Sequence, residues 1–178
     1  MNSYEERSMI FSKIESVMKK KITKIKKLYQ ATIDGGEPAK FHSKCDNIKN
    51  TLVIIKSEGL RRFGGFTPIP WESTEKGNYI NDSSLRSFVF SLDKQKIYYL
   101  KSGGKNSVFH HKTRGPCFGN GHDIGYEGNP IKENTLFTIQ LSYDYKGDEY
   151  SLSEFKYNSF LKKKIKAIEI EVYQFIFD

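Results

Sequence analysis

The sequence has only two cysteines, Cys45 and Cys117, among its 178 residues. So few thiols exclude the disulfide framework of a small secreted domain and indicate a reducing compartment in which both thiols stay free. Long apolar runs are also missing, since no stretch approaches the roughly 20 apolar residues of a membrane-spanning helix and none follows the first charges as in a secretory signal. We therefore expect a cytoplasmic protein, with the nucleus as the alternative.

Recognised signatures of catalysis and of nucleic-acid binding are missing too. The glycine-rich stretch 115–121 has no Gly-Lys-Ser/Thr and leads into strand-type sequence, so it is not a phosphate-binding loop. No nucleophile elbow is present, and Glu169 and Glu171 are typical of the solvated face of a strand. Lysine clusters occur without a recognised nucleic-acid module. We expect no enzyme activity, no cofactor and no specific nucleic-acid partner.

What is present favours one globular domain rich in strands. Hydrophobic residues make up 37% of the chain, and 11 Tyr with 13 Phe favour β-structure. The net charge of +8 is uneven, because residues 1–27 hold eight Lys/Arg and only three Asp/Glu. The basic character is therefore mainly a property of the N-terminal segment, which would act first on an acidic partner or surface.

The N-terminal segment has the spacing of an amphipathic helix. No Gly or Pro interrupts it, Ser3 is a suitable N-cap, and the sequence predicts a helix from Tyr4 to about Tyr29. Its apolar stripe would pack on the domain, on a second copy as in a coiled coil, or on a partner. The stripe consists of Ile10, Ile14, Val17, Met18, Ile22, Ile25 and Leu28.

The rest of the chain alternates strand-type runs with turns. We expect a two-layer antiparallel β-sandwich flanked by short helices. Residues 1–27 would form the basic helix, and residues 28–178 the main domain. The expected strands are 51–55, 60–67, 87–92, 97–100, 136–143 and 167–177; the expected helices are 39–46 and 153–164, with a long loop over 71–84.

Several motifs, taken in order, resemble one known family. The chain reads F-H-S-K-C-D-N from Phe41, R-F-G-G-F-T-P-I-P-W from Arg62, R-G-P-C-F-G-N-G-H-D-I from Arg114 and E-I-E-V-Y-Q-F from Glu169. These motifs resemble the TLDc domain over roughly residues 27–178 and depart from it at Cys117 and Asn120. The residues that carry the resemblance are Phe41, His42, Cys45, Asp46, Gly64, Gly65, Phe66, Trp71, Gly115, Pro116, Phe118, Gly119, Gly121 and Asp123.

The resemblance implies a β-sandwich that binds other proteins. TLDc-like proteins support resistance to oxidative stress, and several bind the vacuolar proton-pumping ATPase and regulate it. We therefore expect a non-catalytic binding module with protein partners that include subunits of this pump. Most of the matching residues are expected to be structural. A structural subunit of a larger assembly, held by the N-terminal helix, is an alternative function.

Cys45 and His42 raise a second alternative. They lie three residues apart on a short predicted helix, so an imidazolium would activate a thiolate and make the protein a weak thiol-based antioxidant enzyme. Cys45 lies near the end of that helix, however, where the helix dipole disfavours a thiolate. A packing role is the favoured interpretation, because free cysteines are mostly inert core residues.

Four residues have the atom types of a zinc site: His110, His111, Cys117 and His122. Adjacent residues of a strand point to opposite faces, so only one of His110 and His111 can join such a site. Because the resemblance implies no histidines at these positions, we expect no metal.

Overall fold

The computed structural model describes residues 3–101, 103–120, 123–138, 143–144 and 164–178. Within these residues the strands form two antiparallel sheets, as the sequence predicts. The large sheet has the order β1 (Ile22–Gln30), β12 (Ala167–Phe177), β2 (Thr51–Ser57), β3 (Arg62–Thr67), β5 (Phe88–Ser91), β6 (Lys96–Leu100) and β11 (Tyr143–Asp144). The small sheet has the order β10 (Leu136–Thr138), β9 (Ile124–Tyr126), β8 (Cys117–Phe118), β7 (Val108–His110) and β4 (Asn78–Ile80).

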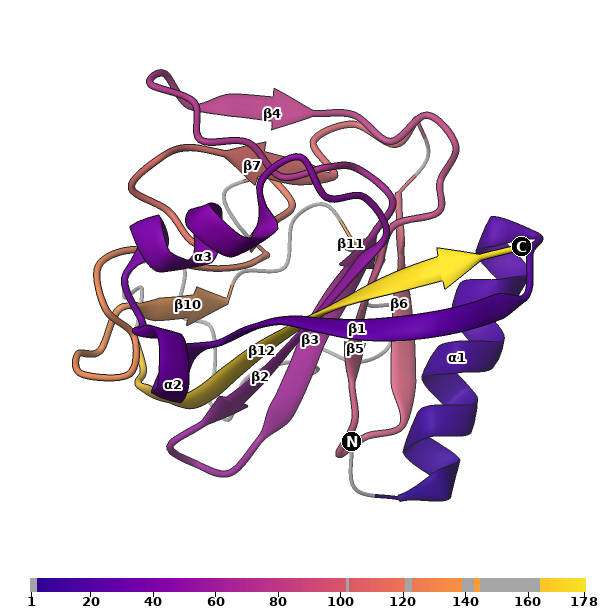
Figure 1. Ribbon diagram of the computed structural model, residues 1–178, viewed down its shortest axis with the longest axis horizontal. Coiled ribbons are helices and arrows are strands. Elements are labelled where there is room, and N and C mark those ends of the chain that lie inside the picture. The colour runs from indigo at the N-terminus through magenta and orange to yellow at the C-terminus, as the bar shows by residue number, and fades with distance from the viewer. Residues whose placement is uncertain (1–2, 102, 121–122, 139–142, 145–163) are drawn as a thin grey trace.

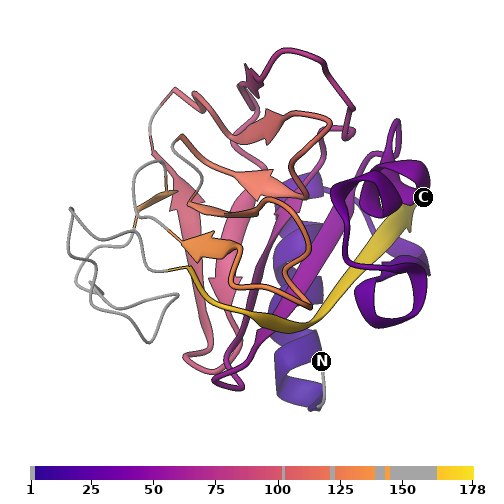
Figure 2. The same ribbon diagram turned by 90° about the vertical axis from the view of Figure 1, so that its left-hand side faces the viewer.

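The two faces of the large sheet are covered differently. One face packs on the small sheet, and the main core lies between them, with Val53, Phe118 and Val172 fully buried. The other face is covered by α1 (Tyr4–Met18), which Figure 1 shows beside the sheet. Figure 2 shows the strands of the small sheet in front of those of the large one. The expected β-sandwich is confirmed.

The N-terminal segment corrects the predicted helix. Helix α1 starts after the Ser3 cap, whose hydroxyl accepts from the Glu6 amide at 3.1 Å, and ends at Met18, because Lys19 adopts a left-handed conformation with φ 55°. Residues 22–30 form strand β1, so the second half of the predicted helix is wrong, and the expected boundary at residue 27 falls inside a strand. The β-branched Ile22, Thr23 and Ile25 suit the strand that β12 pairs with.

Helix α1 belongs to the domain itself. Ile10 and Ile14 are fully buried and pack with Phe66, Phe88 and Phe175 on the outer face of the large sheet. The helical part of the stripe is thus used against the domain rather than in a coiled coil. An ion pair from Glu6 to Arg62 of β3 (2.8 Å) further fixes this helix to the sheet, and Arg62 also pairs with Asp93 (3.2 Å) in the turn between β5 and β6.

The other predicted elements mostly agree with the structure. Helix α3 (Pro38–Cys45) and strand β12 lie where they are expected, and α2 (Ala31–Asp34) is an additional short helix. The predicted loop 71–84 contains the short strand β4. The predicted strand 136–143 supplies β10 and β11, with 139–142 outside the described residues, and the predicted helix 153–164 lies almost wholly outside them. Neither α1 nor the shorter helices of the described part have the length and apolar character needed to span a bilayer.

Candidate functional site

Three of the four sequence motifs meet around Trp71, in a group of buried residues that we call the Trp71 cluster: Phe41, His42, Cys45, Trp71, His110 and Phe118. The Trp71 ring is 5.5 Å from the Phe41 and Phe118 rings, edge to face in both cases. Its indole N–H donates to the Thr51 hydroxyl at 2.8 Å, inside the core. Only 1% of Trp71 is exposed. The cluster therefore joins α3, the small sheet and the loop that follows β3.

His42 connects α3 to the loop that follows β7. Its Nδ1 lies 2.7 Å from the Asp46 carboxylate, and its Nε2 lies 2.8 Å from the Arg114 carbonyl oxygen and 3.1 Å from that of His111. The second Asp46 oxygen accepts from the Ser73 hydroxyl. A shallow groove opens beside this pair, lined by Ala39, His42, Ser43, Asp46, Ser73, Lys112 and Thr113. The geometry makes His42 a clamp between two segments.

The two cysteines are surrounded by core residues. Burial, with the neighbouring Asp46 and Asp34 charges, raises the pKa of the Cys45 thiol far above its usual value. Burial likewise raises the pKa of Cys117 to about 12. Both ring nitrogens of His42 contact groups other than Cys45: the Asp46 carboxylate on one side, and the His111 and Arg114 carbonyl oxygens on the other. These surroundings disfavour the thiolate that a peroxide-consuming cysteine needs.

Of the four residues with the atom types of a zinc site, the three that the structure describes are not brought together to bind a metal ion. His110 is buried beside Trp71, whereas His111 lies half-buried, stacked on Phe109 with ring centroids 6.2 Å apart. His122 is outside the described residues. No three His, Cys, Asp or Glu side chains in the part that the structure describes are arranged to hold a metal ion. Neither ring nitrogen of His110 has a hydrogen-bond partner there, and burial lowers its pKa.

The glycine-rich loop after β8 is a packing element. Gly119 has φ +83°, a left-handed conformation that glycine tolerates. Asp123 is fully buried, close to Gly119, and its Oδ2 accepts from the Tyr143 amide at 2.8 Å. Gly115 and Pro116 are buried too, Gly115 against the Tyr126 ring. Gly121 lies outside the described residues.

The Gly64-Gly65 pair in β3 allows close packing on both of its faces. A Cβ at Gly64 would clash with the Val53 carbonyl, and one at Gly65 would lie 2.6 Å from the Phe118 ring. The pair therefore reflects sheet packing. Phe66 faces the other way, into the layer beneath α1, and is the one aromatic of the motif set that the structure separates from the Trp71 cluster.

The comparison with family models decides what these motifs mean. The TLDc domain model matches residues 3–176, which is nearly the whole chain. The chain belongs to the TLDc domain family. The match includes α1 and β1, and the TLDc motifs noted in the sequence lie within it. Among curated proteins, no match to this chain is found.

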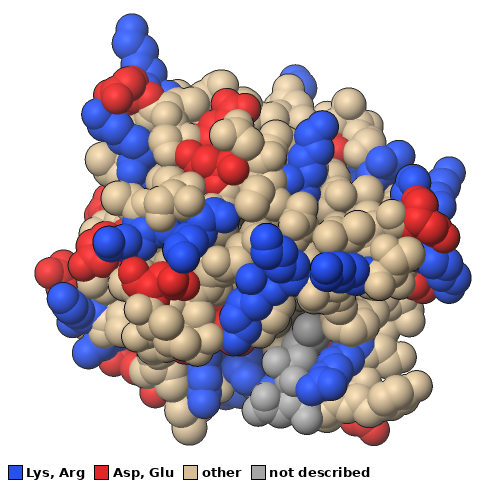
Figure 3. Space-filling model, in the orientation of Figure 1, with Lys and Arg blue, Asp and Glu red and all other residues tan. Residues whose placement is uncertain are grey.

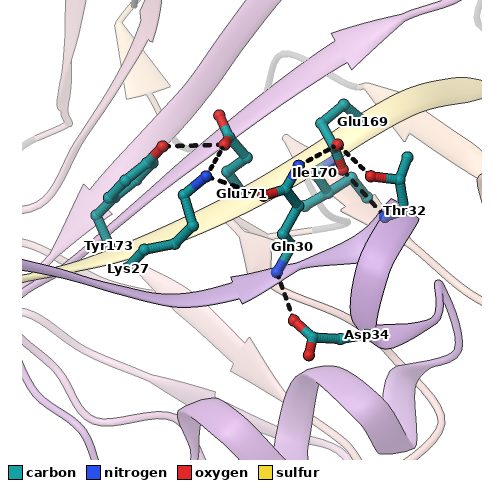
Figure 4. A network of polar contacts seen from close by, with 8 residues as sticks. All are labelled: Lys27, Gln30, Thr32, Asp34, Glu169, Ile170, Glu171 and Tyr173. Atoms are coloured by element: carbon teal, nitrogen blue, oxygen red, sulfur yellow. Dashed lines mark hydrogen bonds and ion pairs between the residues drawn. The ribbon is translucent and has the colours of Figure 1, made fainter.

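Sequence reasoning missed one surface of this TLDc domain, the edge strand β1. On the α1 side of the sheet, Figure 4 shows a polar network that ties β1 to β12. Lys27 donates to Glu171 at 2.6 Å, and Tyr173 donates to the same oxygen at 3.0 Å. Gln30 and Thr32 donate to Glu169 at 2.9 and 2.5 Å. The alternation of Lys with Ile in this segment was the available signal, but the helical spacing concealed it.

Asp82 is a second residue that sequence reasoning missed. It is buried in the loop before β5 and accepts from the Ser87 hydroxyl at 2.8 Å, the Ser87 amide at 2.7 Å and the Arg86 amide at 2.9 Å. Burial alone would raise the pKa of this carboxyl, but hydrogen bonds from Ser84 and Ser87 outweigh it and lower the pKa. The carboxylate therefore organises the loop.

Proposed function

We propose that this TLDc-family chain is a non-catalytic, cytoplasmic protein-binding module that supports resistance to oxidative stress, in part by binding and regulating the vacuolar proton-pumping ATPase. The observation that carries the proposal is the family match over residues 3–176. The domain needs no cofactor for this role. Its contribution is a stable β-sandwich that presents surfaces to a partner.

The location of the motif residues supports a binding role over a chemical one. Phe41, Cys45, Trp71 and Phe118 are all buried, where they hold the two sheets and α3 together. Burial raises the pKa of both thiols and so disfavours peroxide chemistry. The exposed positions on the strands and helices remain for contacts with other proteins.

The test is affinity capture from the native cell with the tagged chain at its natural level. Peripheral subunits of the proton pump should be enriched with the wild-type chain over a tag-only control. Cells that lack the protein should survive peroxide less well, and re-expression should restore survival. Recovery of no pump subunit, together with unchanged peroxide survival, would contradict the proposal.

A further inference from the structure

Strand β1 has one paired side and one open side. It pairs with β12 along its length, and within the described residues no strand pairs with its other side. Figure 1 shows it crossing the front of the molecule, between α1 and α2. The side chains of residues 22–28 are exposed or half-buried, whereas Tyr29, near α2 and α3, is buried. The Ile22 amide already donates to the Glu15 carboxylate at 3.0 Å, which leaves residues 23–28 of the open strand, roughly 20 Å long, for pairing.

The register distributes two kinds of side chain over the two faces of this edge. Lys24 and Lys26 lie opposite Ile176 and Gln174, on the face away from α1. Ile25 and Lys27 lie opposite Phe175 and Tyr173, on the α1 face. One face of the open edge is therefore basic, and the other has an apolar position, since Ile25 is 38% exposed.

The positive charge on the first face is not neutralised by neighbouring acids. Lys27 is paired with Glu171, and Lys21 is paired with Glu15 at 2.8 Å. Lys24 and Lys26 have no ion-pair or hydrogen-bond partner among the residues that the structure describes. Figure 3 shows lysine and arginine side chains along the band that β1 occupies in the same view. The edge combines unpaired backbone groups with unpaired cations.

We infer that β1 is a docking edge for an extended acidic segment of a partner protein, which adds to the large sheet as one more strand. Main-chain hydrogen bonds supply the pairing, and side-chain alternation supplies the specificity. The partner segment carries Asp or Glu at alternate positions, facing Lys24 and Lys26. It carries apolar residues between them, facing Ile25. This inference rests on the proposed function, because it names the surface that a binding module uses.

A second copy of the chain is a poor occupant of the same edge. Two β1 strands side by side would bring their lysines together, and edge lysines are a common device against such self-pairing. The same lysines that repel another β1 attract a strand of opposite charge, where cross-strand ion pairs are favourable. Charge complementarity therefore selects an acidic partner over self-association.

The probe is a fluorescent nine-residue peptide that alternates Glu and Val, titrated into the whole chain at low and at physiological salt. Binding is expected, weaker at higher salt because exposed charges are screened. A peptide of the same sequence with every backbone amide methylated keeps its carboxylates but has no amide donors. It is expected not to bind, and the amide protons of β1 should gain protection from exchange only with the unmethylated peptide.

The variant pair separates this edge from general positive charge. Lys24→Glu with Lys26→Glu should weaken peptide binding at least about tenfold, because two attractions become repulsions. Lys76→Glu with Lys105→Glu makes the same charge change at exposed positions away from β1 and should leave binding unchanged. Unfolding curves of both variants check that the fold persists.

Four outcomes would overturn the inference: equal binding of the methylated peptide, equal losses in both variants, binding to phosphatidylserine vesicles without binding to the peptide, or a dimer that Lys24→Glu with Lys26→Glu abolishes. Absence of peptide binding would overturn it as well. Capture of pump subunits that persists in the β1 variant would reject the docking edge and leave the proposed function standing. Peptide binding without capture of pump subunits would support the docking edge and count against the pump as the partner.

Discussion

The Trp71 cluster and the β1 edge lie in one domain and use opposite physical means. The cluster is built from aromatic rings, with a hydrogen bond from Trp71 to Thr51 inside the core. The edge is built from lysines and unpaired backbone groups, with most side chains exposed. Of the motif residues that the structure describes, most lie in or near the cluster. Phe66 is buried elsewhere, and the last motif, Glu169 to Phe175, lies on β12 beside the edge. A motif-based reading therefore finds what stabilises the domain before it finds what the domain contacts.

The difference predicts that stability and binding respond to separate residues. Changes in the Trp71 cluster should unfold the domain and lose binding as a consequence. Changes on the open side of β1 should alter binding while the unfolding curve stays where it is. The predictions below test this separation, from the largest expected effect on stability to the smallest.

Trp71→Ala should have the largest effect. It empties the centre of the cluster and leaves the buried Thr51 hydroxyl without its donor. Large-to-small core changes of this type cost about 3–5 kcal/mol. The free energy of unfolding, measured by denaturant titration, should fall by about this amount in Trp71→Ala. It should fall by less in Trp71→Phe, which keeps an aromatic ring in the cluster. A Trp71→Ala domain as stable as the wild type would remove the cluster from its structural role.

His42→Ala should have a smaller but clear effect. The change removes the partner of Asp46 and of two carbonyl groups, those of His111 and Arg114. Leaving buried polar groups unsatisfied costs about 1–3 kcal/mol. Thermal unfolding measures the loss, and amide exchange should increase around residues 111–114. If Lys44→Ala, an exposed change on the same helix, destabilised the domain equally, the clamp would be refuted.

Cys45→Ser tests whether the cluster performs chemistry. Burying a hydroxyl in place of a thiol should destabilise the domain, by about 1–3 kcal/mol, while peroxide consumption should not change. Cys45→Ala is the matched control without a polar group. The contrary result would be that the wild-type domain consumes peroxide and that both variants fold but do not. That result would establish the thiol-based antioxidant enzyme that the sequence left as an alternative.

Lowering the pH should weaken the Trp71 cluster through His110. The pKa of His110 in the folded domain lies below its ordinary value, because burial disfavours the charged ring. The unfolded chain therefore binds a proton at His110 more readily than the folded domain does. The stability contributed by the neutral, buried His110 ring is present above about pH 6.5 and is lost as the pH falls through the pKa of the folded state. Unfolding curves from pH 7.5 down to 5 measure the slope. His110→Phe should reduce that slope, and an unchanged slope would contradict the assignment.

Lys24→Ser with Lys26→Ser should have the smallest effect on stability. Both side chains are exposed and have no partner among the described residues. Surface changes of this type usually stay within about 0.5 kcal/mol. The same double variant should nonetheless lose affinity for the acidic peptide. A large loss of stability would show that the edge and the cluster are not separate.

The sequence predicts the sandwich well because its strands carry strong local signals. Thr51–Ser57 is a β-branched apolar run, and Ala167–Phe177 alternates between buried and exposed positions. Five of the six residues of the Trp71 cluster belong to the motifs, and His110 does not. The mutual contacts of these residues do not follow from the motifs, since Trp71 meets Phe118 across 47 positions of sequence, and only the packing of the small sheet on the large one brings the two together.

The second half of the N-terminal segment was predicted wrongly for a physical reason. Ile22, Ile25 and Leu28 fit a helical repeat, and no Gly or Pro marks the break after Met18. Residues 22–30 form a strand because they pair with β12, which comes from the other end of the chain. Local spacing cannot register a partner about 150 residues away, and such tertiary pairing overrides helix propensity.

The position of β12 also bears on how the domain is made. This strand lies between β1 and β2, so neither of those two can complete its pairing before residues 167–177 have left the ribosome. Until then the nascent chain holds two unsatisfied strand edges, and closing them joins segments of very high sequence separation, which slows folding. We expect chaperones to bind the growing polypeptide at these edges, and the domain to become protease-resistant only once β12 has left the ribosome.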